Sequence, residues 1–163
     1  MKRSENALSL RRADGGDKEL VFSWRNDPSV RRNSFHTEEI PWEMHSSWYD
    51  RMLADPARRL FILEDAGVPV GQVRLDREGE EAEISYLIAP GKQGMGYGTE
   101  LIRMVQEQAP GLVSGMLSGK GGGPVRVLTA QVRKENSASR RIFEKLGFAS
   151  AGEGESLLYR YEF

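Results

Sequence analysis

The sequence predicts an α/β fold of the α+β kind, in which helices cover both faces of a mixed, mostly antiparallel twisted sheet. Three observations support this class. Three strand-like runs near the middle of the chain are separated only by short turn signals, which favours an antiparallel meander. Helical periods lie before and after the meander. The 163 residues are enough for one core and show no internal repeat, so residues 1–163 are expected to form a single domain. We expect six to seven strands and about four helices.

The first third of the chain is expected to hold one short strand and two helices. Residues 7–11 alternate in polarity as a strand does. Asp17 is a candidate cap for a first helix, which Asn26-Asp27-Pro28 closes. Residues 29–40 show no clear period and are expected to form a loop. A second helix is expected over residues 41–54.

The strand-like runs of the meander occupy residues 60–63, 68–75 and 81–88. Turn signals at residues 65–67 and 77–79 separate them. Alternation of this kind is typical of antiparallel neighbours joined by short turns. The elements expected after the meander are a helix that starts at Thr99, a glycine-rich loop over 115–124, a strand over 125–132, a helix over 137–146 and final strands at Gly147-Phe148 and 156–161.

The composition excludes several classes of function. The net charge of −1 and the pI near 6.2 oppose a dedicated nucleic-acid binder. The absence of cysteine excludes disulfides, thiolate catalysis and thiolate-ligated metals, and with only two histidines we expect no metal site. No apolar run is long enough for a signal peptide or a transmembrane segment. We therefore expect a cytoplasmic protein with no membrane partner.

A glycine-rich turn after the third strand of the meander is the most informative local feature. Glycines at positions 94, 96 and 98 allow backbone N–H groups to converge, and the following helix adds the partial positive charge of its N-terminus. Such a turn suits a pyrophosphate. A P-loop does not fit, because Gly121 follows Gly119-Lys120, and the dinucleotide fingerprint does not fit either. The pattern Gln-x-x-Gly-x-Gly does fit, from Gln93 onward.

This pattern resembles the pyrophosphate loop of the GNAT acetyltransferase superfamily, which binds acetyl-CoA. A second segment, residues 132–148, is similar to the strand–Asn–helix–Gly-Phe segment of that superfamily. The element order β-α-α-β-β-β-α-β-α-β-β is that of the GNAT fold and covers nearly the whole chain. The resemblance implies an enzyme that uses acetyl-CoA and no metal. It transfers the acetyl group directly to a primary amine in a ternary complex.

The resemblance also implies a cofactor site. The strands over 81–88 and 125–132 are expected to splay apart, and a backbone N–H there can polarise the thioester carbonyl. Asn136 is expected to bond the pantetheine arm, with a helix cap as the alternative. The residues expected to bind the cofactor are Leu87, Ile88, Gln93, Gly94, Met95, Gly96, Tyr97, Gly98, Thr99, Asn136, Ser139 and Phe143.

Acid–base chemistry has three candidate side chains, Glu83, Tyr86 and His45. Glu83 resembles the strand glutamate that some members use as a base, directly or through water, and its alternative is a solvent-facing position. Members often have a tyrosine that meets the CoA sulfur, but this chain has Phe143 there, and a phenyl ring donates no proton. The remaining proton donors are Tyr86, Tyr97, Ser139 and water.

The acceptor side is expected in the N-terminal third. Residues 24–31 and 43–48 resemble segments of bacterial nucleotide-sugar N-acetyltransferases, which act on a UDP-linked 4-amino-6-deoxy sugar in pseudaminic acid biosynthesis. Arginines there can pair with phosphates, and aromatic rings can stack on a base or a sugar. The favoured acceptor is therefore a nucleotide-linked amino sugar. The residues expected to bind it are Trp24, Arg25, Asn26, Arg31, His45 and Trp48, with Arg32, Phe35 and Trp42 as further candidates.

Two other functions remain open. Related Trp-Arg-Asn motifs occur in acetyltransferases of ribosomal protein N-termini, so a protein or peptide N-terminal amine is the alternative acceptor. The missing tyrosine at Phe143 leaves open an acyl-CoA-binding module without catalysis. Core packing is the alternative for Trp24 and Trp48, and a solvated loop for Arg31-Arg32. Exposed strand edges also allow a homodimer.

Overall fold

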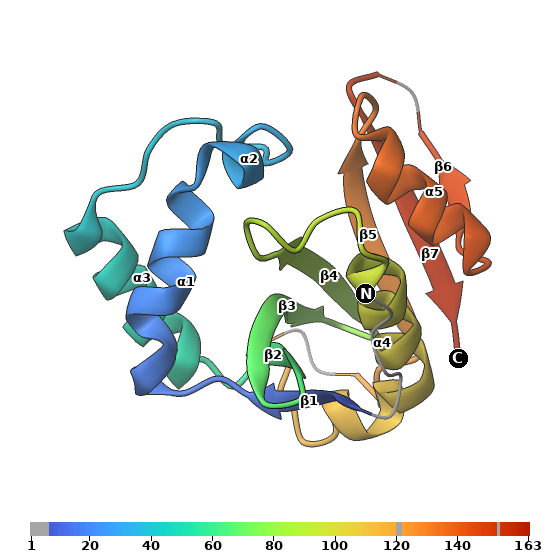
Figure 1. Ribbon diagram of the computed structural model, residues 1–163. Coiled ribbons are helices and arrows are strands. Elements are labelled where there is room, and N and C mark those ends of the chain that lie inside the picture. Colours follow the sequence, from blue (N-terminus) through green and yellow to red (C-terminus); the bar gives the residue numbers. More distant parts are fainter. Residues whose placement is uncertain (1–6, 120–121, 153) are drawn as a thin grey trace.

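The sheet and its helices form three layers in the computed structural model, which describes residues 7–119, 122–152 and 154–163 (Figure 1). The seven strands follow the order β1-β2-β3-β4-β5-β7-β6. The strands are β1 (Leu8–Arg12), β2 (Arg58–Asp65), β3 (Val68–Glu78), β4 (Glu81–Ile88), β5 (Val127–Arg133), β6 (Ala149–Ala151) and β7 (Ser156–Glu162). The helices are α1 (Lys18–Asn26), α2 (Pro28–Arg31), α3 (Trp42–Ala54), α4 (Tyr97–Val113) and α5 (Ser137–Lys145), with a 3-10 turn, η2 (Gly15–Asp17), before α1. The expected mixed, mostly antiparallel sheet is confirmed.

One parallel pair interrupts the antiparallel sheet and creates an opening. β4 and β5 pair in parallel only where Glu81, Ala82 and Glu83 face Val127, Leu128 and Thr129. β4 continues for five more residues, which remain paired with β3 but not with β5. The expected splaying of these two strands is therefore confirmed. The unpaired edge of β4 faces into the gap.

Both faces of the sheet are covered, which explains the continuous apolar run of β2. Phe61 and Leu63 pack into the core under α4 and α5, whereas Leu60 and Ile62 pack into the core under α1 and α3. In Figure 1, α1, α2 and α3 lie on one side of the sheet and α4 and α5 on the other. A strand buried on both faces needs apolar side chains at consecutive positions.

Several element boundaries differ from the expectation. The expected loop over 29–40 begins with the helix α2, because Pro28 is pre-organised for the first helical turn and the Asp27 side chain accepts the Ser29 N–H at 2.9 Å. α4 starts at Tyr97 rather than at Thr99. The strand expected from residue 125 starts at Val127, and Gly147-Phe148 precede β6 instead of belonging to a strand.

Some expectations concern residues that the structure does not describe. Residues 1–6, which bear on the expected absence of a leader, and positions 120–121 of the expected glycine-rich loop lie outside the described ranges. Within those ranges, no helix has the length and apolar character needed to cross a bilayer. The same residues include no group of three or more His, Asp or Glu side chains able to hold a metal ion.

Candidate active site

A cavity of about 960 Å³ lies where β4 and β5 diverge. Its walls come from α1, α2 and α3, the loop after α2, the middle of β3, β4 from Glu83 to its end, the glycine-rich turn with the start of α4, the end of β5, and α5. Fifteen of the residues expected at a site line it. They are Arg25, Trp48, Glu83, Tyr86, Leu87, Ile88, Gln93, Gly94, Gly96, Tyr97, Gly98, Thr99, Asn136, Ser139 and Phe143.

The glycine-rich turn forms one end of this cavity. Gly94 and Gly96 have φ values of 76° and 85°, which only glycine adopts without strain. Gly96 is the N-cap of α4 and has no side chain to cover the first N–H groups of the helix, so these donors are available to an anion. Gln93 Nε2 donates to the Ile88 carbonyl at 3.4 Å and holds the turn against β4. The geometry of the turn is compatible with a pyrophosphate, and binding at this position stays a prediction.

Two other residues of the turn are placed differently. A Cβ atom at Gly98 would lie 2.9 Å from Ile142 Cδ1, so glycine at this position allows α4 and α5 to pack closely. Met95 is 44% exposed and does not line the cavity. The structure therefore does not bring Met95 together with the rest of the expected cofactor site.

The unpaired edge of β4 supplies backbone donors to the cavity. The Ala89 N–H donates to the Val70 carbonyl at 2.9 Å, and antiparallel neighbours use alternate residues for such bonds. The N–H groups of Ile88 and Tyr86 therefore point away from β3, toward the gap left by β5. Of the two residues expected near the thioester, Ile88 presents its N–H to the cavity, whereas Leu87 faces β3.

The hydroxyl groups near this edge differ in their hydrogen-bond partners. The Tyr86 and Ser139 hydroxyl oxygens lie 2.8 Å apart in the cavity, and burial raises the pKa of Tyr86. Tyr97 instead donates its hydroxyl to Asp65 at 2.5 Å. The ring of Phe143 stacks on that of Tyr159 with centroids 5.5 Å apart. Tyr86 and Ser139 are thus the hydroxyls of the expected set that remain available to a bound ligand.

Asn136 starts α5 at the wall of the cavity. Its side chain accepts the Ser139 N–H at 3.2 Å, so Asn136 is the N-cap of α5. The helix cap, the alternative role of Asn136, is therefore formed. The cap also fixes Ser139 beside Tyr86.

Glu83 lies at the other end of β4, half-buried in the cavity wall. Burial raises the pKa of Glu83, Asp76 and Glu78 add to this shift, and Arg74 opposes it. A carboxylate with a raised pKa is a better proton acceptor at neutral pH. The expected rise in the pKa of Glu83 is therefore present, and its role as a general base stays a prediction.

Four of the residues expected at the acceptor site do not line this cavity. His45 is fully buried, and Trp24 belongs to the core under α1 and α3. Asn26 donates to and accepts from the Ile40 backbone, at 2.8 and 2.7 Å, and thereby holds the loop after α2. Arg31 lines a separate, smaller cavity. These four residues therefore lie outside the lining of the larger cavity.

The contacts of His45 fix its protonation state. Arg25 Nη1 is 3.0 Å from His45 Nδ1, and a guanidinium only donates, so Nδ1 is the acceptor. Nε2 lies 2.8 Å from the Lys18 carbonyl and therefore carries the proton. Burial lowers the pKa of His45, which is consistent with a neutral ring. The structure places His45 in the packing of α1 against α3, away from any reacting atom.

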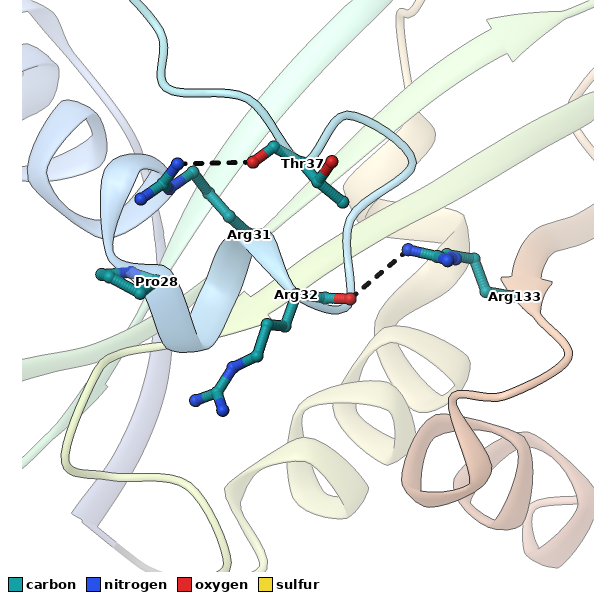
Figure 2. A pocket seen from close by; sticks show the side chains of 5 residues that line it. All are labelled: Pro28, Arg31, Arg32, Thr37 and Arg133. Atoms are coloured by element: carbon teal, nitrogen blue, oxygen red, sulfur yellow. Dashed lines mark hydrogen bonds between the residues drawn. The ribbon is translucent and has the colours of Figure 1, made fainter.

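A smaller cavity of about 330 Å³ adjoins the loop after α2 and is lined by Pro28, Arg31, Arg32, Thr37 and Arg133 (Figure 2). Arg31 donates to the carbonyls of Asn26 and Thr37, and Arg133 donates to the carbonyls of Arg32 and Ser34. These two arginines therefore brace the loop. The side chain of Arg32 points away from both (Figure 2).

Sequence reasoning missed a polar row on the sheet face that looks toward α1 and α3. Val73 and Leu75 pack under α4, so the alternating side chains of Gln72, Arg74 and Asp76 point to the opposite face. Glu83, Ser85 and Leu87 of β4 share that face. The sequence does contain a signal for this row, because Gln72, Arg74 and Asp76 alternate with apolar residues along β3. The alternation does not show which face of the sheet meets a ligand, since that depends on where the helices pack.

Known proteins match this chain over nearly its whole length. A family model described as "Acetyltransferase (GNAT) domain" matches residues 7–149. The spermidine N(1)-acetyltransferase of Escherichia coli K12 is 28% identical over 156 residues, which cover 92% of this chain and 77% of that protein. The spermidine N(1)-acetyltransferase of Vibrio cholerae is 23% identical over 150 residues, 89% of this chain and 80% of that protein.

Solved structures share the fold. Spermidine N-acetyltransferase from Vibrio cholerae in complex with CoA and spermine has a TM-score of 0.78 and 22% identity, with 95% of this chain and 94% of that chain covered. A domain from Methanocaldococcus jannaschii has a TM-score of 0.77 and 22% identity, with 96% of this chain and 98% of that chain covered. The curated relatives are named for a polyamine, so the expected likeness to nucleotide-sugar enzymes finds no support among them.

Proposed function

The chain belongs to the acetyltransferase (GNAT) domain family and is an acetyl-CoA-dependent N-acetyltransferase, and we propose that it acts by direct attack of a primary amine in a ternary complex. The observation that carries this proposal is the open edge of β4 beside the glycine-rich turn. Acetyl-CoA placed there has its pyrophosphate at the N-terminus of α4 and its pantetheine arm between β4 and β5. Its thioester then reaches the Ile88 N–H.

The reaction requires three groups around the thioester. The amine nitrogen bonds to the acetyl carbon as the bond from carbon to sulfur breaks, and the Ile88 N–H stabilises the charge on the carbonyl oxygen. The amine proton passes to Glu83. The Cα atoms of Glu83 and Leu87 are about 13 Å apart along the strand, so this proton travels through water. The leaving thiolate takes the Tyr86 proton, and the Ser139 hydroxyl orients Tyr86.

The acceptor has three candidate classes. The curated relatives favour a polyamine, since they are named spermidine N(1)-acetyltransferases. The arginines of the acceptor wall favour the nucleotide-linked amino sugar that the sequence indicates, because Arg25 and Arg74 line the cavity. A protein N-terminal amine is the third candidate. The Vibrio cholerae spermidine enzyme has a dodecameric structure, and a homo-oligomer of this chain stays a prediction.

The test is mass spectrometry of three acceptors after incubation with enzyme and acetyl-CoA. They are spermidine, a UDP-linked 4-amino-6-deoxy sugar and a ribosomal N-terminal peptide. We expect one acetyl group on an amine nitrogen and one released CoA thiol per product. Binding of acetyl-CoA without acetylation of these or other primary amines would overturn the proposal in favour of a non-catalytic acyl-CoA-binding module.

A further inference from the structure

The polar row on the sheet face forms three rungs between β3 and β4. Gln72 pairs with Leu87, Arg74 with Ser85, and Asp76 with Glu83. Leu87 is next to Ile88, whose N–H faces the thioester, so the first rung lies beside the reacting carbon. Successive rungs on one face are two residues, or about 7 Å, apart. The position of a side chain along this row therefore gives its approximate distance from the reacting amine.

The second rung lies in a cluster of cations around the ring of Trp48. The guanidinium carbons of Arg25 and Arg74 lie 4.2 and 5.5 Å from the ring centroid. A third cation, Arg58, shares the carboxylate of Asp76 with Arg74, at 3.1 Å from each. Three guanidinium groups thus gather around Trp48, and one carboxylate, Asp76 of the third rung, pairs with two of them, Arg58 and Arg74.

Among the described residues, Arg25 has no anionic partner. It is half-buried, its guanidinium bonds to the neutral ring of His45, and no carboxylate in the described ranges lies within ion-pair distance of it. Burial and the charge of Arg74 lower the pKa of Arg25 to about 10, so it remains a cation at neutral pH. A cation that has lost water without gaining a counter-ion raises the free energy of the folded state. An anion bound at this position would remove that penalty.

The first rung also has an unused group. Gln72 is 6% exposed and lines the cavity, and its Oε1 atom has no hydrogen-bond partner among the described residues. Buried amide oxygens are nearly always paired. An amine N–H that approaches the thioester beside Leu87 would be a donor for this oxygen.

We propose that the acceptor carries a phosphate or carboxylate about 7 Å from its reactive amine, with Arg25 and Arg74 binding the anion and Gln72 Oε1 binding the amine. This inference rests on the proposed function and specifies its acceptor. It excludes polyamines, whose second ammonium would lie among the arginines. The described residues of the cavity wall agree, since Arg25, Arg74, Lys92 and Arg133 line it and Glu83 is the one carboxylate.

The experiment compares four amines with the same four-carbon spacer. They are 1,4-diaminobutane, 4-aminobutan-1-ol, 5-aminopentanoate and 4-aminobutyl phosphate. We expect kcat/KM at saturating acetyl-CoA to be about tenfold higher for an anionic amine than for the alcohol, and lowest for the diamine. The carboxylate and phosphate members show which anion is preferred. A diamine that equals or exceeds both anionic amines would overturn the inference and leave the proposed function standing.

Variants show which arginines produce the preference. Arg25→Gln and Arg74→Gln should each reduce the ratio of anionic to neutral amine to within about threefold, with an unchanged Kd for acetyl-CoA as the test of folding. Arg51, exposed on α3 and bonded to Ser47, is the matched control as Arg51→Gln. Loss of the preference in Arg32→Gln, with retention in both cavity variants, would overturn the assignment. No acetylation of any amine would overturn the proposed function itself.

Discussion

In the proposed mechanism, the two ends of the cavity recognise their ligands by different means. The cofactor end is built from backbone groups of two short segments, the glycine-rich turn with α4 and the edge of β4. The acceptor end is built from side chains of α1, α3, β3 and β4, which are far apart in the sequence. Backbone recognition persists through many sequence changes, whereas side-chain recognition changes with single substitutions. At 28% identity, similarity to a relative is therefore a stronger argument for the same reaction than for the same acceptor.

The largest effect should come from the backbone at the cofactor end. Gly96→Val places a β-branched side chain at φ 85° and covers the N-terminus of α4, so we expect the Kd for acetyl-CoA to rise about 100-fold or more. Isothermal titration measures it. Gly67→Val is the matched control, because Gly67 has φ 82° in the turn between β2 and β3 and does not line the cavity. The control should lose stability and keep its affinity. Equal Kd values for both variants would contradict the assignment.

Glu83→Gln tests whether Glu83 accepts the proton of the amine. It should lower kcat by about 100-fold and leave the Kd for acetyl-CoA unchanged, because the amine loses its proton acceptor. The pKa of Glu83 is raised, so kcat/KM of the wild type should fall as the pH drops through that raised value, where the carboxylate becomes protonated. Glu43→Gln, on the exposed start of α3, is the control. An identical pH profile in Glu83→Gln would remove Glu83 from the mechanism.

Tyr86→Phe should lower kcat by about tenfold, since the thiolate then takes its proton from water. Tyr97→Phe is the control, because the hydroxyl that it loses donates to Asp65, a residue that does not line the cavity. That control should cost about 1 kcal/mol of stability and keep kcat. Stopped-flow release of the CoA thiol measures both variants. A larger loss of kcat in Tyr97→Phe than in Tyr86→Phe would contradict the assignment of Tyr86 as the proton donor.

The smallest effect concerns the scaffold behind the acceptor end. The folded-state pKa of His45 lies below its ordinary value of 6.5, so the unfolded chain binds more protons as the pH falls below 6.5. The contribution of His45 to stability is therefore complete above pH 6.5 and is lost as the pH falls toward the folded-state pKa. We expect the Tm of the wild type to fall more steeply between pH 7 and pH 5 than that of His45→Gln, while His36→Gln, at an exposed position, retains the wild-type slope.

The same contrast explains what the sequence alone could predict. The glycine-rich turn, the cap at Asn136 and the split between β4 and β5 are local or follow from element order, and the structure contains all three. His45 and Trp24 lie on the expected segments, but the packing of α1 against α3 buries them away from the cavity. Arg31 also lies on an expected segment, but it donates to the carbonyls of Asn26 and Thr37 and lines the smaller cavity instead. Gln72 and Arg74 belong to no recognisable motif. A polar residue on an alternating strand can be assigned to a site only when the positions of the helices are known.

The most direct test of the difference between the two ends is a competition in one tube. Equimolar 5-aminopentanoate and 1,4-diaminobutane share a limiting amount of acetyl-CoA, and mass spectrometry counts the two acetylated products. Their ratio equals the ratio of kcat/KM values. The account predicts an excess of acetylated 5-aminopentanoate of about tenfold or more. An excess of acetylated diamine would show that the acceptor end binds a polycation, and would contradict the account.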